Sequence, residues 1–424
     1  MNNIGGRAPI TRTHTLGIFL LFCLLPLGFI VSNSSRSIAG ESSCQIFPVQ
    51  TQTSTGSCPP RIAQGTTPHA PIQINGDNFT VENGVLPGGD GSRENPYVIA
   101  SLSINGHLPL FESRPGGYPS IRIENTTAHF TITMCNLSFG IFLINVTRAN
   151  VTDNVIISDS DMGLEHAGIF LKNSTDCVIN HNSLQSTTGY GWRHPPLYIF
   201  FSFKIQITGN SLISETTPPT SDTEAIVLDQ SPNCIVRYNT IERFDWGIRI
   251  GYYYDLLTTN CTIEGNTCFQ NHWGIYVQNS RNSITDNLCT KNSFGIYVHY
   301  SDDNYIAQNT CTMNEVDGMY MDHSDNNSIY KNTFSDNLYY GIRMKTCYYN
   351  HIWENVLLNN TKGPILDQDG FLNVIEDNQI PFSMPLWGWV ALVGVTIVGG
   401  SALFWIGFKF YRQKWRERRA TSST

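Results

Sequence analysis

The chain has 424 residues, only 14% of them charged, and a formal net charge of −8 at pH 7. The first 31 residues carry +2 and the residues from 386 onward carry +5, so the part between them carries −15. So acidic a domain would be repelled by a phosphate backbone, which excludes nucleic acid as an expected partner. The abundance of Asn, Thr and Tyr, all poor helix formers, favours an all-β protein.

The N-terminal region predicts export. Within residues 1–32, the apolar stretch Leu16 to Val31 follows Arg7 and Arg12, which is the pattern of a secretory signal peptide or, if it is not cleaved, of an N-terminal anchor. Residues 33–71 are rich in Ser, Thr, Gln and Pro and are expected to form a flexible linker. Residues 72–120 are expected to form a cap over the first coil of the repeats that follow.

Residues 121–380 are dominated by an internal repeat of 21 to 29 residues. An apolar residue follows each repeated asparagine by two positions, and a Gly-led strand of period two comes next. Such units bury their apolar faces only by stacking, and stacked carboxamides can hydrogen-bond to one another. The pattern predicts an all-β, right-handed parallel β-helix of about ten coils with an asparagine ladder made of Asn154, Asn182, Asn210, Asn239, Asn266, Asn287, Asn309, Asn332, Asn355 and Asn378.

Two motifs carry a family resemblance. Asn-x-Ile-x-x-Asn recurs, as in Asn282 to Asn287, beside strands that read Gly-Ile-Tyr-Val, and a lead-in segment runs from Gly88 to Ile99. From Ile72 to Ile380 the chain resembles the NosD-like, carbohydrate-binding and sugar-hydrolase class of pectin-lyase-like β-helices, in its archaeal, membrane-anchored form. The resemblance implies a sugar-related role without fixing one activity, since the class includes binders, lyases, hydrolases and epimerases.

Three consecutive repeats carry about six extra residues at the same corner, between the ladder asparagine and the next strand. Stacked carboxylates, imidazoles and an arginine could supply a general acid and base for glycoside or uronate chemistry. The alternative is that these side chains are solvent-exposed turn residues without a functional role. The catalytic candidates at this corner are Asp161, Glu165, His166, Arg193, His194 and Glu224.

A second set of candidates follows an outward-facing column of the Gly-led strands. Aromatic residues flanked by Arg on a long sheet suit an extended polysaccharide, whereas cross-strand stacking that only stabilises the sheet is the competing interpretation. The ligand-binding candidates are Trp192, from one of the extra segments, and Tyr198, Tyr276, Tyr297, Tyr320 and Arg343.

No metal site is predicted, and the sequence leaves the cofactor unknown, with Ca²⁺ as one possibility. Asp302 and Asp325 are expected to stack in successive turns and could hold Ca²⁺, although solvated turn residues would show the same pattern.

The C-terminal region predicts a membrane anchor. Residues 386–408 contain no charge and as a helix would span about 34 Å, enough to cross a lipid bilayer. The basic residues of 409–424 place that tail in the cytoplasm. We therefore expect a single-pass protein of the cell membrane with an extracellular β-helix that binds, or binds and modifies, polysaccharide. The alternatives are a structural or adhesive surface pillar without sugar chemistry, and a polysaccharide lyase or hydrolase.

Overall fold

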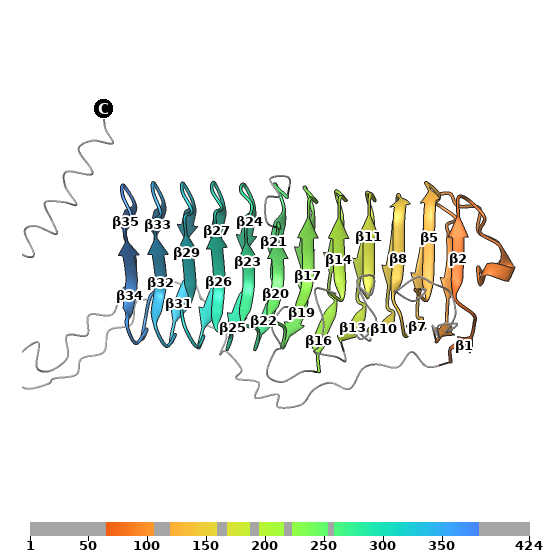
Figure 1. Ribbon diagram of the computed structural model, residues 1–424, viewed down its shortest axis with the longest axis horizontal. Helices are drawn as coiled ribbons and strands as arrows, with labels where there is room; N and C mark the ends of the chain where they lie inside the picture. Colours follow the sequence, from red (N-terminus) through yellow and green to blue (C-terminus); the bar gives the residue numbers. More distant parts are fainter. Residues whose placement is uncertain are drawn as a thin grey trace, which may run out of the picture. The chain divides into compact units, whose positions relative to one another are not determined.

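A computed structural model describes residues 65–105, 119–158, 168–186, 195–215, 223–252 and 258–380. These residues form a solenoid whose strands run parallel in three sheets, which confirms the predicted parallel β-helix (Figure 1). The one helical element among them is a single 3-10 turn, η1 (Val81–Asn83). None of the described helical residues forms a helix that could cross a membrane, and residues 386–408 lie outside the described ranges.

Each coil adds one strand to each sheet. Sheet A contains β1 (Thr67–Pro68), β4 (Leu102–Ile104), β7 (Asn136–Leu137), β10 (Val155–Ser158), β13 (Ser183–Ser186), β16 (Ser211–Ser214), β19 (Thr240–Glu242), β22 (Thr267–Phe269), β25 (Leu288–Thr290), β28 (Thr310–Thr312) and β31 (Thr333–Ser335).

Sheet B forms the face that carries the predicted aromatic column. It contains β2 (Ile72–Asn75), β5 (Ile121–Thr126), β8 (Ile141–Val146), β11 (Ile169–Lys172), β14 (Leu197–Phe200), β17 (Glu224–Asp229), β20 (Trp246–Ile250), β23 (Trp273–Val277), β26 (Phe294–His299), β29 (Met319–Asp322), β32 (Tyr340–Lys345) and β34 (Gly363–Gln368).

Sheet C completes each coil. It contains β3 (Tyr97–Ala100), β6 (Phe130–Thr133), β9 (Ala149–Thr152), β12 (Val178–Asn180), β15 (Gln206–Thr208), β18 (Ile235–Arg237), β21 (Thr262–Glu264), β24 (Ser283–Thr285), β27 (Tyr305–Ala307), β30 (Ser328–Tyr330), β33 (His351–Trp353) and β35 (Val374–Glu376).

The interior is a set of apolar columns along the rod. In sheet C, for example, Ile284, Ile306, Ile329 and Ile352 are register partners in successive coils, and each is fully buried. Burial of one such side chain contributes roughly 1.5–3 kcal/mol. No coil could bury this column alone, so stability depends on contact between neighbouring coils.

The ten predicted ladder asparagines form one continuous stack. From Asn154 to Asn378, each donates through Nδ2 to Oδ1 of the next at 2.9–3.0 Å. The same Oδ1 also accepts the backbone N–H of the preceding asparagine, as Asn309 does from Asn287. The residue before each asparagine is left-handed, for example Asp286 with φ of 57°, and this single residue turns the chain sharply between sheets C and A.

Two further asparagine ladders occupy the other two corners of the later coils. One joins Asn271, Asn292, Asn314, Asn337 and Asn360 between sheets A and B. The other joins Asn282, Asn304, Asn327, Asn350 and Asn373 between sheets B and C. From β22 onward, the coil is therefore fixed by buried carboxamides at all three corners.

The solenoid begins earlier than the repeat count predicts. Sheets B and C each contain twelve strands, not about ten, because two coils precede the first ladder asparagine. One coil is β2, β3 and β4, which lie within the segment expected to be a cap and pair in the same three sheets. The other is β5, β6 and β7, where Cys135 occupies the ladder position before Asn154 and donates its backbone N–H to the Asn154 Oδ1 at 3.0 Å.

Candidate functional site

Most of the predicted catalytic residues lie outside the described ranges. Residues 159–167, 187–194 and 216–222 are not described, and they hold Asp161, Glu165, His166, Trp192, Arg193 and His194. The described strands show where these segments attach. Each leaves a sheet A strand, namely β10, β13 or β16, and each is followed by the sheet B strand of the next coil. A catalytic role for these residues remains a prediction.

Glu224, the catalytic candidate that is described, lies in a buried ion pair. Its Oε1 contacts Nη1 of Arg249, and the two side chains are only 5% and 4% exposed. The Arg249 guanidinium also packs over the rings of Trp246 and Tyr252, at 4.5 and 4.1 Å from their centroids. Such enclosure leaves the Glu224 carboxylate little access to a polymeric substrate.

The outward column of sheet B is in register along the rod, but it is not uniformly exposed. Phe142, Phe170, Tyr198, Val227, Arg249, Tyr276, Tyr297, Tyr320 and Arg343 are successive register partners. Of the ligand-binding candidates in this column, Tyr276 is only 2% exposed, whereas Tyr198, Tyr297, Tyr320 and Arg343 are partly exposed. Direct contact with a ligand is therefore open to the latter group.

The exposed tyrosine rings stack on one another along the rod. Tyr297 and Tyr320 have ring centroids 4.9 Å apart and planes 9° apart, and the far side of Tyr320 is covered by the Arg343 guanidinium at 4.2 Å. Phe294 is also nearly parallel to both tyrosine rings, at 27–28°. Because these neighbours lie against the ring faces, the ring edges and the phenol hydroxyls are the parts of the two tyrosines left for a ligand.

Next to the tyrosines lies a network of titratable groups. The Tyr276 hydroxyl is 2.8 Å from Nδ1 of His299, and Nε2 of His299 is 3.7 Å from Oδ2 of Asp322. The other oxygen of Asp322 contacts Nδ1 of His323 at 2.9 Å. Burial lowers the pKa of His299, and the Asp322 charge opposes this only in part. Burial, followed by the charge of Asp229, raises the pKa of Tyr198 well above its ordinary value.

Arg343 is anchored by a carboxylate that sequence reasoning did not select. Its Nη2 lies 2.7 Å from Oδ2 of Asp317, whose side chain is fully buried. Asp317 also accepts the backbone N–H of Tyr340 through Oδ1 at 3.0 Å. A sequence signal was present, because the residue before the glycine is aromatic in several of the later coils, such as Trp273 before Gly274, whereas Asp317 precedes Gly318.

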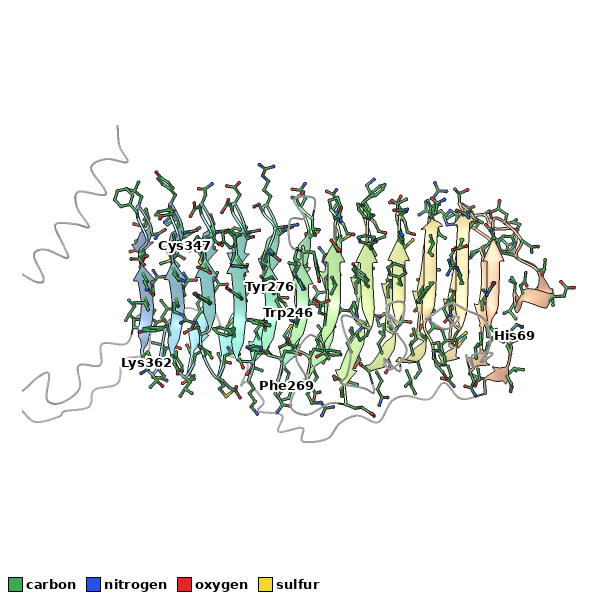
Figure 2. The ribbon with its side chains drawn as sticks, in the orientation of Figure 1. His69, Trp246, Phe269, Tyr276, Cys347 and Lys362 are labelled. Carbon is green, nitrogen blue, oxygen red and sulfur yellow. The ribbon has the colours of Figure 1, made fainter. Side chains whose placement is uncertain are left out.

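We define the platform as the polar and aromatic groups that project outward on β23, β26, β29 and β32 together with Asp317, which lies two residues before β29. Figure 2 marks Tyr276 and Trp246 near the middle of the rod. The polar members of the platform are Tyr276, Tyr297, His299, Asp317, Tyr320, Asp322, Arg343 and Lys345.

Metal binding finds little support in the described part of the chain. It contains no group of three or more His, Cys, Asp or Glu side chains arranged to hold a metal ion. Asp302 and Asp325 do stack, but one oxygen of Asp302 accepts the backbone N–H of Asp325 at 2.7 Å, and Asp325 likewise accepts from Tyr348 at 2.7 Å. These bonds explain the two aspartates as links between turns of successive coils.

The interior cysteines also lack the character of metal or redox ligands. Cys268, Cys289 and Cys311 are fully buried register partners within sheet A. Burial raises the pKa of Cys311 well above its ordinary value, and at two other interior positions it raises the pKa of Cys135 to about 11 and of Cys177 to about 12. A buried thiol whose pKa is raised in this way stays protonated and serves as a small apolar side chain.

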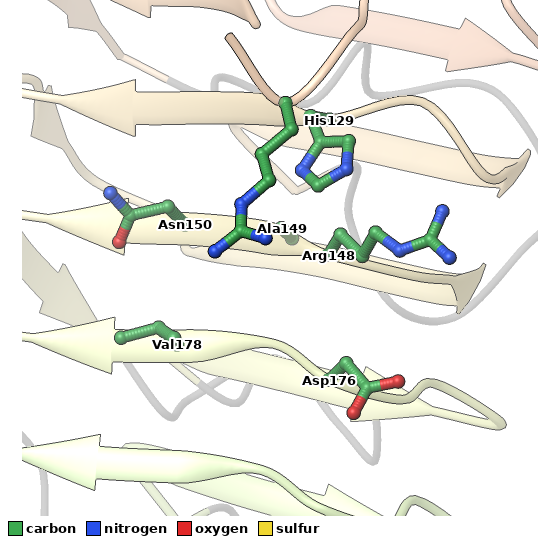
Figure 3. Close-up of a pocket in the computed structure, with 7 residues that line it drawn as sticks. His129, Arg148, Ala149, Asn150, Asp176 and Val178 are labelled. Atoms are coloured by element: carbon green, nitrogen blue, oxygen red, sulfur yellow. The ribbon is translucent and has the colours of Figure 1, made fainter.

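A separate pocket lies on sheet C, away from the platform. Figure 3 shows Arg148 and Asn150 around β9, Asp176 and Val178 around β12, and His129 nearby. Arg93 completes a cavity of about 670 Å³. Both signs of charge line it, and the charged side chains are exposed, so the pocket has the character of an open, solvated surface depression.

Comparisons with known proteins match part of the chain to one protein family. A family model described as "Periplasmic copper-binding protein (NosD)" matches residues 197–376, which run from β14 to β35. This match supports a NosD-like parallel β-helix over those residues. The described residues contain no group of three or more His, Cys, Asp or Glu side chains that could hold a copper ion. No curated protein matches the chain.

Several solved structures are similar to this one. They include a mutant of the periplasmic alginate epimerase AlgG, 15% identical, covering 68% of this chain and 86% of that one with a TM-score of 0.45. The exopolygalacturonase from Thermotoga maritima is 7% identical over 66% and 82% of the chains with a TM-score of 0.42. The A-module of the Azotobacter vinelandii mannuronan C-5 epimerase AlgE4 is 11% identical over 67% and 89%, with a TM-score of 0.39. Similarity at this level transfers none of these activities.

Proposed function

We propose that this chain is an exported, single-pass membrane protein whose β-helix lies outside the cell and binds polysaccharide along the platform. The apolar segments at residues 16–31 and 386–408 support export and anchoring, as does the basic tail. The word "periplasmic" in the description of the matched family agrees with a domain outside the cytoplasm.

The observation that carries the proposal is the repetition of polar groups along one face. Parallel strands of successive coils lie ~4.8 Å apart, so a polymer that lies along the rod meets an equivalent position at every coil. At these positions the platform offers the hydroxyls of Tyr297 and Tyr320, the imidazole of His299 and the carboxylate of Asp322. Such groups can donate to and accept from sugar hydroxyls.

A second candidate, a polysaccharide lyase or hydrolase, is favoured by the contacts of His299. Its imidazole is oriented by the Tyr276 hydroxyl on one edge and faces Asp322 on the other. A lowered pKa keeps the ring neutral and able to accept a proton. A lyase or hydrolase has a second candidate centre in the three extra segments. Its candidate catalytic residues are His166, Arg193 and His194.

The test is affinity electrophoresis and release of reducing or unsaturated ends, performed on the full chain in detergent across a polysaccharide panel. Retention without product supports binding. Product release that is lost in His299→Gln, or in the triple alanine variant of His166, Arg193 and His194, assigns an enzyme and its centre. Neither retention nor product across the panel would favour the pillar. The control is Asp153→Asn, because Asp153 is exposed and lies in an earlier coil.

A further inference from the structure

The four strands of the platform lie within residues 258–380, which are described without a gap. Arg343 and Lys345 are the arginine and lysine on these strands, and Arg249 lies beside them on β20. The way each is compensated determines what kind of polymer this face can accept.

The Arg343 guanidinium is enclosed on two sides. Its Nη2 lies 2.7 Å from a carboxylate oxygen of the fully buried Asp317, and its plane packs 4.2 Å from the centroid of Tyr320. An anionic sugar that bound here would have to compete with a carboxylate that is already in place and cannot move into water. The positive charge of Arg343 is therefore directed inward, toward the protein.

Arg249, the next arginine along the column, is compensated in the same way. Its partner Glu224 is buried with it, and the rings of Trp246, Tyr252 and Tyr276 lie within 4.1–5.7 Å of the guanidinium. The same arrangement thus occurs twice, at the coils that flank the three tyrosines of the platform. In each case an arginine contacts a buried acid, which lies at or just before the start of a sheet B strand, and aromatic rings pack against the guanidinium.

Lys345 is the remaining cation, and its register partner in the preceding coil is Asp322. His299 adds no charge at neutral pH because burial lowers its pKa. Each of these three cations thus has a carboxylate against it or in register with it, namely Glu224, Asp317 or Asp322. The part of the chain between the two basic ends carries −15, and this negative field opposes the approach of a polyanion.

We infer that the platform takes an uncharged polysaccharide, and that Asp317 and Glu224 act as specificity-determining residues by cancelling the arginines that would otherwise recruit uronate or sulfated polymers. This inference rests on the proposed function and names its substrate class. It also separates this chain from alginate and polygalacturonate as ligands.

The test uses pairs of polymers that share a backbone and differ in charge, with the full chain in detergent. Methyl-esterified and free polygalacturonan form one pair, and hydroxyethyl- and carboxymethylcellulose form the other. We expect the uncharged member of at least one pair to bind at least about tenfold more tightly than its anionic partner, with little dependence on salt. Tighter, salt-sensitive binding of an anionic member would overturn the inference and leave polysaccharide binding intact. Failure of every polymer to bind would overturn both.

A gain-of-function variant sharpens this result. Asp317→Asn keeps the acceptor for the Tyr340 N–H but removes the charge that cancels Arg343. We expect affinity for the anionic polymers to rise by about tenfold relative to the affinity for the uncharged members of the same pairs. The double variant Asp317→Asn/Arg343→Gln should lose the gain, and Asp153→Asn should show none. An unchanged preference in a folded Asp317→Asn variant, with folding checked by its melting temperature, would contradict the assignment of Asp317.

Discussion

The hydroxyl of Tyr276 lies 2.8 Å from Nδ1 of His299, a contact between adjacent coils that is closed on its other edge by Asp322, 3.7 Å from Nε2. Burial lowers the pKa of His299 below its ordinary value, and Asp322 raises it only in part while His323 lowers it further. The folded protein thus disfavours the protonated imidazole.

This shift predicts a pH dependence of stability. Because the pKa is lower in the folded state, the contribution of His299 is fully present above its unfolded value of about 6.5 and is lost as the pH falls through the folded value. We expect the melting temperature of wild type to fall more steeply in that window than that of His299→Gln, with Asp322 and His323 common to both proteins. An NMR titration of the His299 ring should give a midpoint below about 6.5. Parallel melting curves would contradict the prediction.

The main asparagine ladder predicts a large local cost for one substitution. In Asn287→Ala, the backbone N–H and the carboxamide of Asn266 lose their acceptor, and the carbonyl of Ile263 loses a donor. Unsatisfied buried groups in a cooperative network should cost about 3–5 kcal/mol of unfolding free energy.

Thermal or denaturant unfolding measures that cost. The matched control is Asn75→Ala at the exposed end of β2, where the asparagine accepts one exposed bond from Asn125 and its loss should change stability by less than about 1 kcal/mol. Equal effects of the two substitutions would show that stacking of the ladder carboxamides adds nothing.

Glu224 gives a test between a catalytic and a structural role. Removing its carboxylate in Glu224→Ala takes away the buried acid that contacts the Arg249 guanidinium, which should destabilise the fold by about 3–5 kcal/mol. Glu264→Ala, which breaks the more exposed pair with Arg237, should cost under about 1 kcal/mol. Replacing the first pair together, as Glu224→Leu/Arg249→Met, should restore much of the loss. If Glu224→Ala instead abolished turnover at unchanged stability, the buried pair would not be its main role.

The architecture was predictable because the repeat has one physical cause, the need of each coil to bury its apolar face on the next. The main ladder was equally predictable, since few side chains other than that of asparagine can both donate and accept hydrogen bonds at a buried corner. The second ladder was missed although its signal was simple: five residues after Asn266, Asn287 and Asn309 comes another asparagine. The first coils were missed because they lack the ladder residue.

The candidate site was less predictable, because alternation along a strand gives the direction of a side chain and not its surroundings. Tyr276 faces outward in register, yet Arg249 and neighbouring rings bury it. Likewise, the stacking of Tyr297 on Tyr320 depends on side-chain torsions that a sequence pattern does not specify. The sequence pattern did not predict Asp317 as a site residue, because its partner Arg343 lies 26 residues away and one coil further along the rod.

Substitutions of the stacked tyrosines can distinguish a binding platform from a structural pillar. Because neighbouring groups cover the faces of Tyr297 and Tyr320, their rings contribute to stability and their hydroxyls are the parts left for a ligand. In the double variant Tyr297→Phe/Tyr320→Phe, we expect polysaccharide affinity to fall about tenfold or more while the melting temperature stays within about 2 °C. In the corresponding alanine variant we expect both to fall, since aromatic pairing and packing are also lost. Affinity electrophoresis and thermal unfolding of the same preparations separate the cases: full retention of binding by the phenylalanine variant, with stability lost in the alanine variant, would identify the tyrosines as structural and favour the pillar.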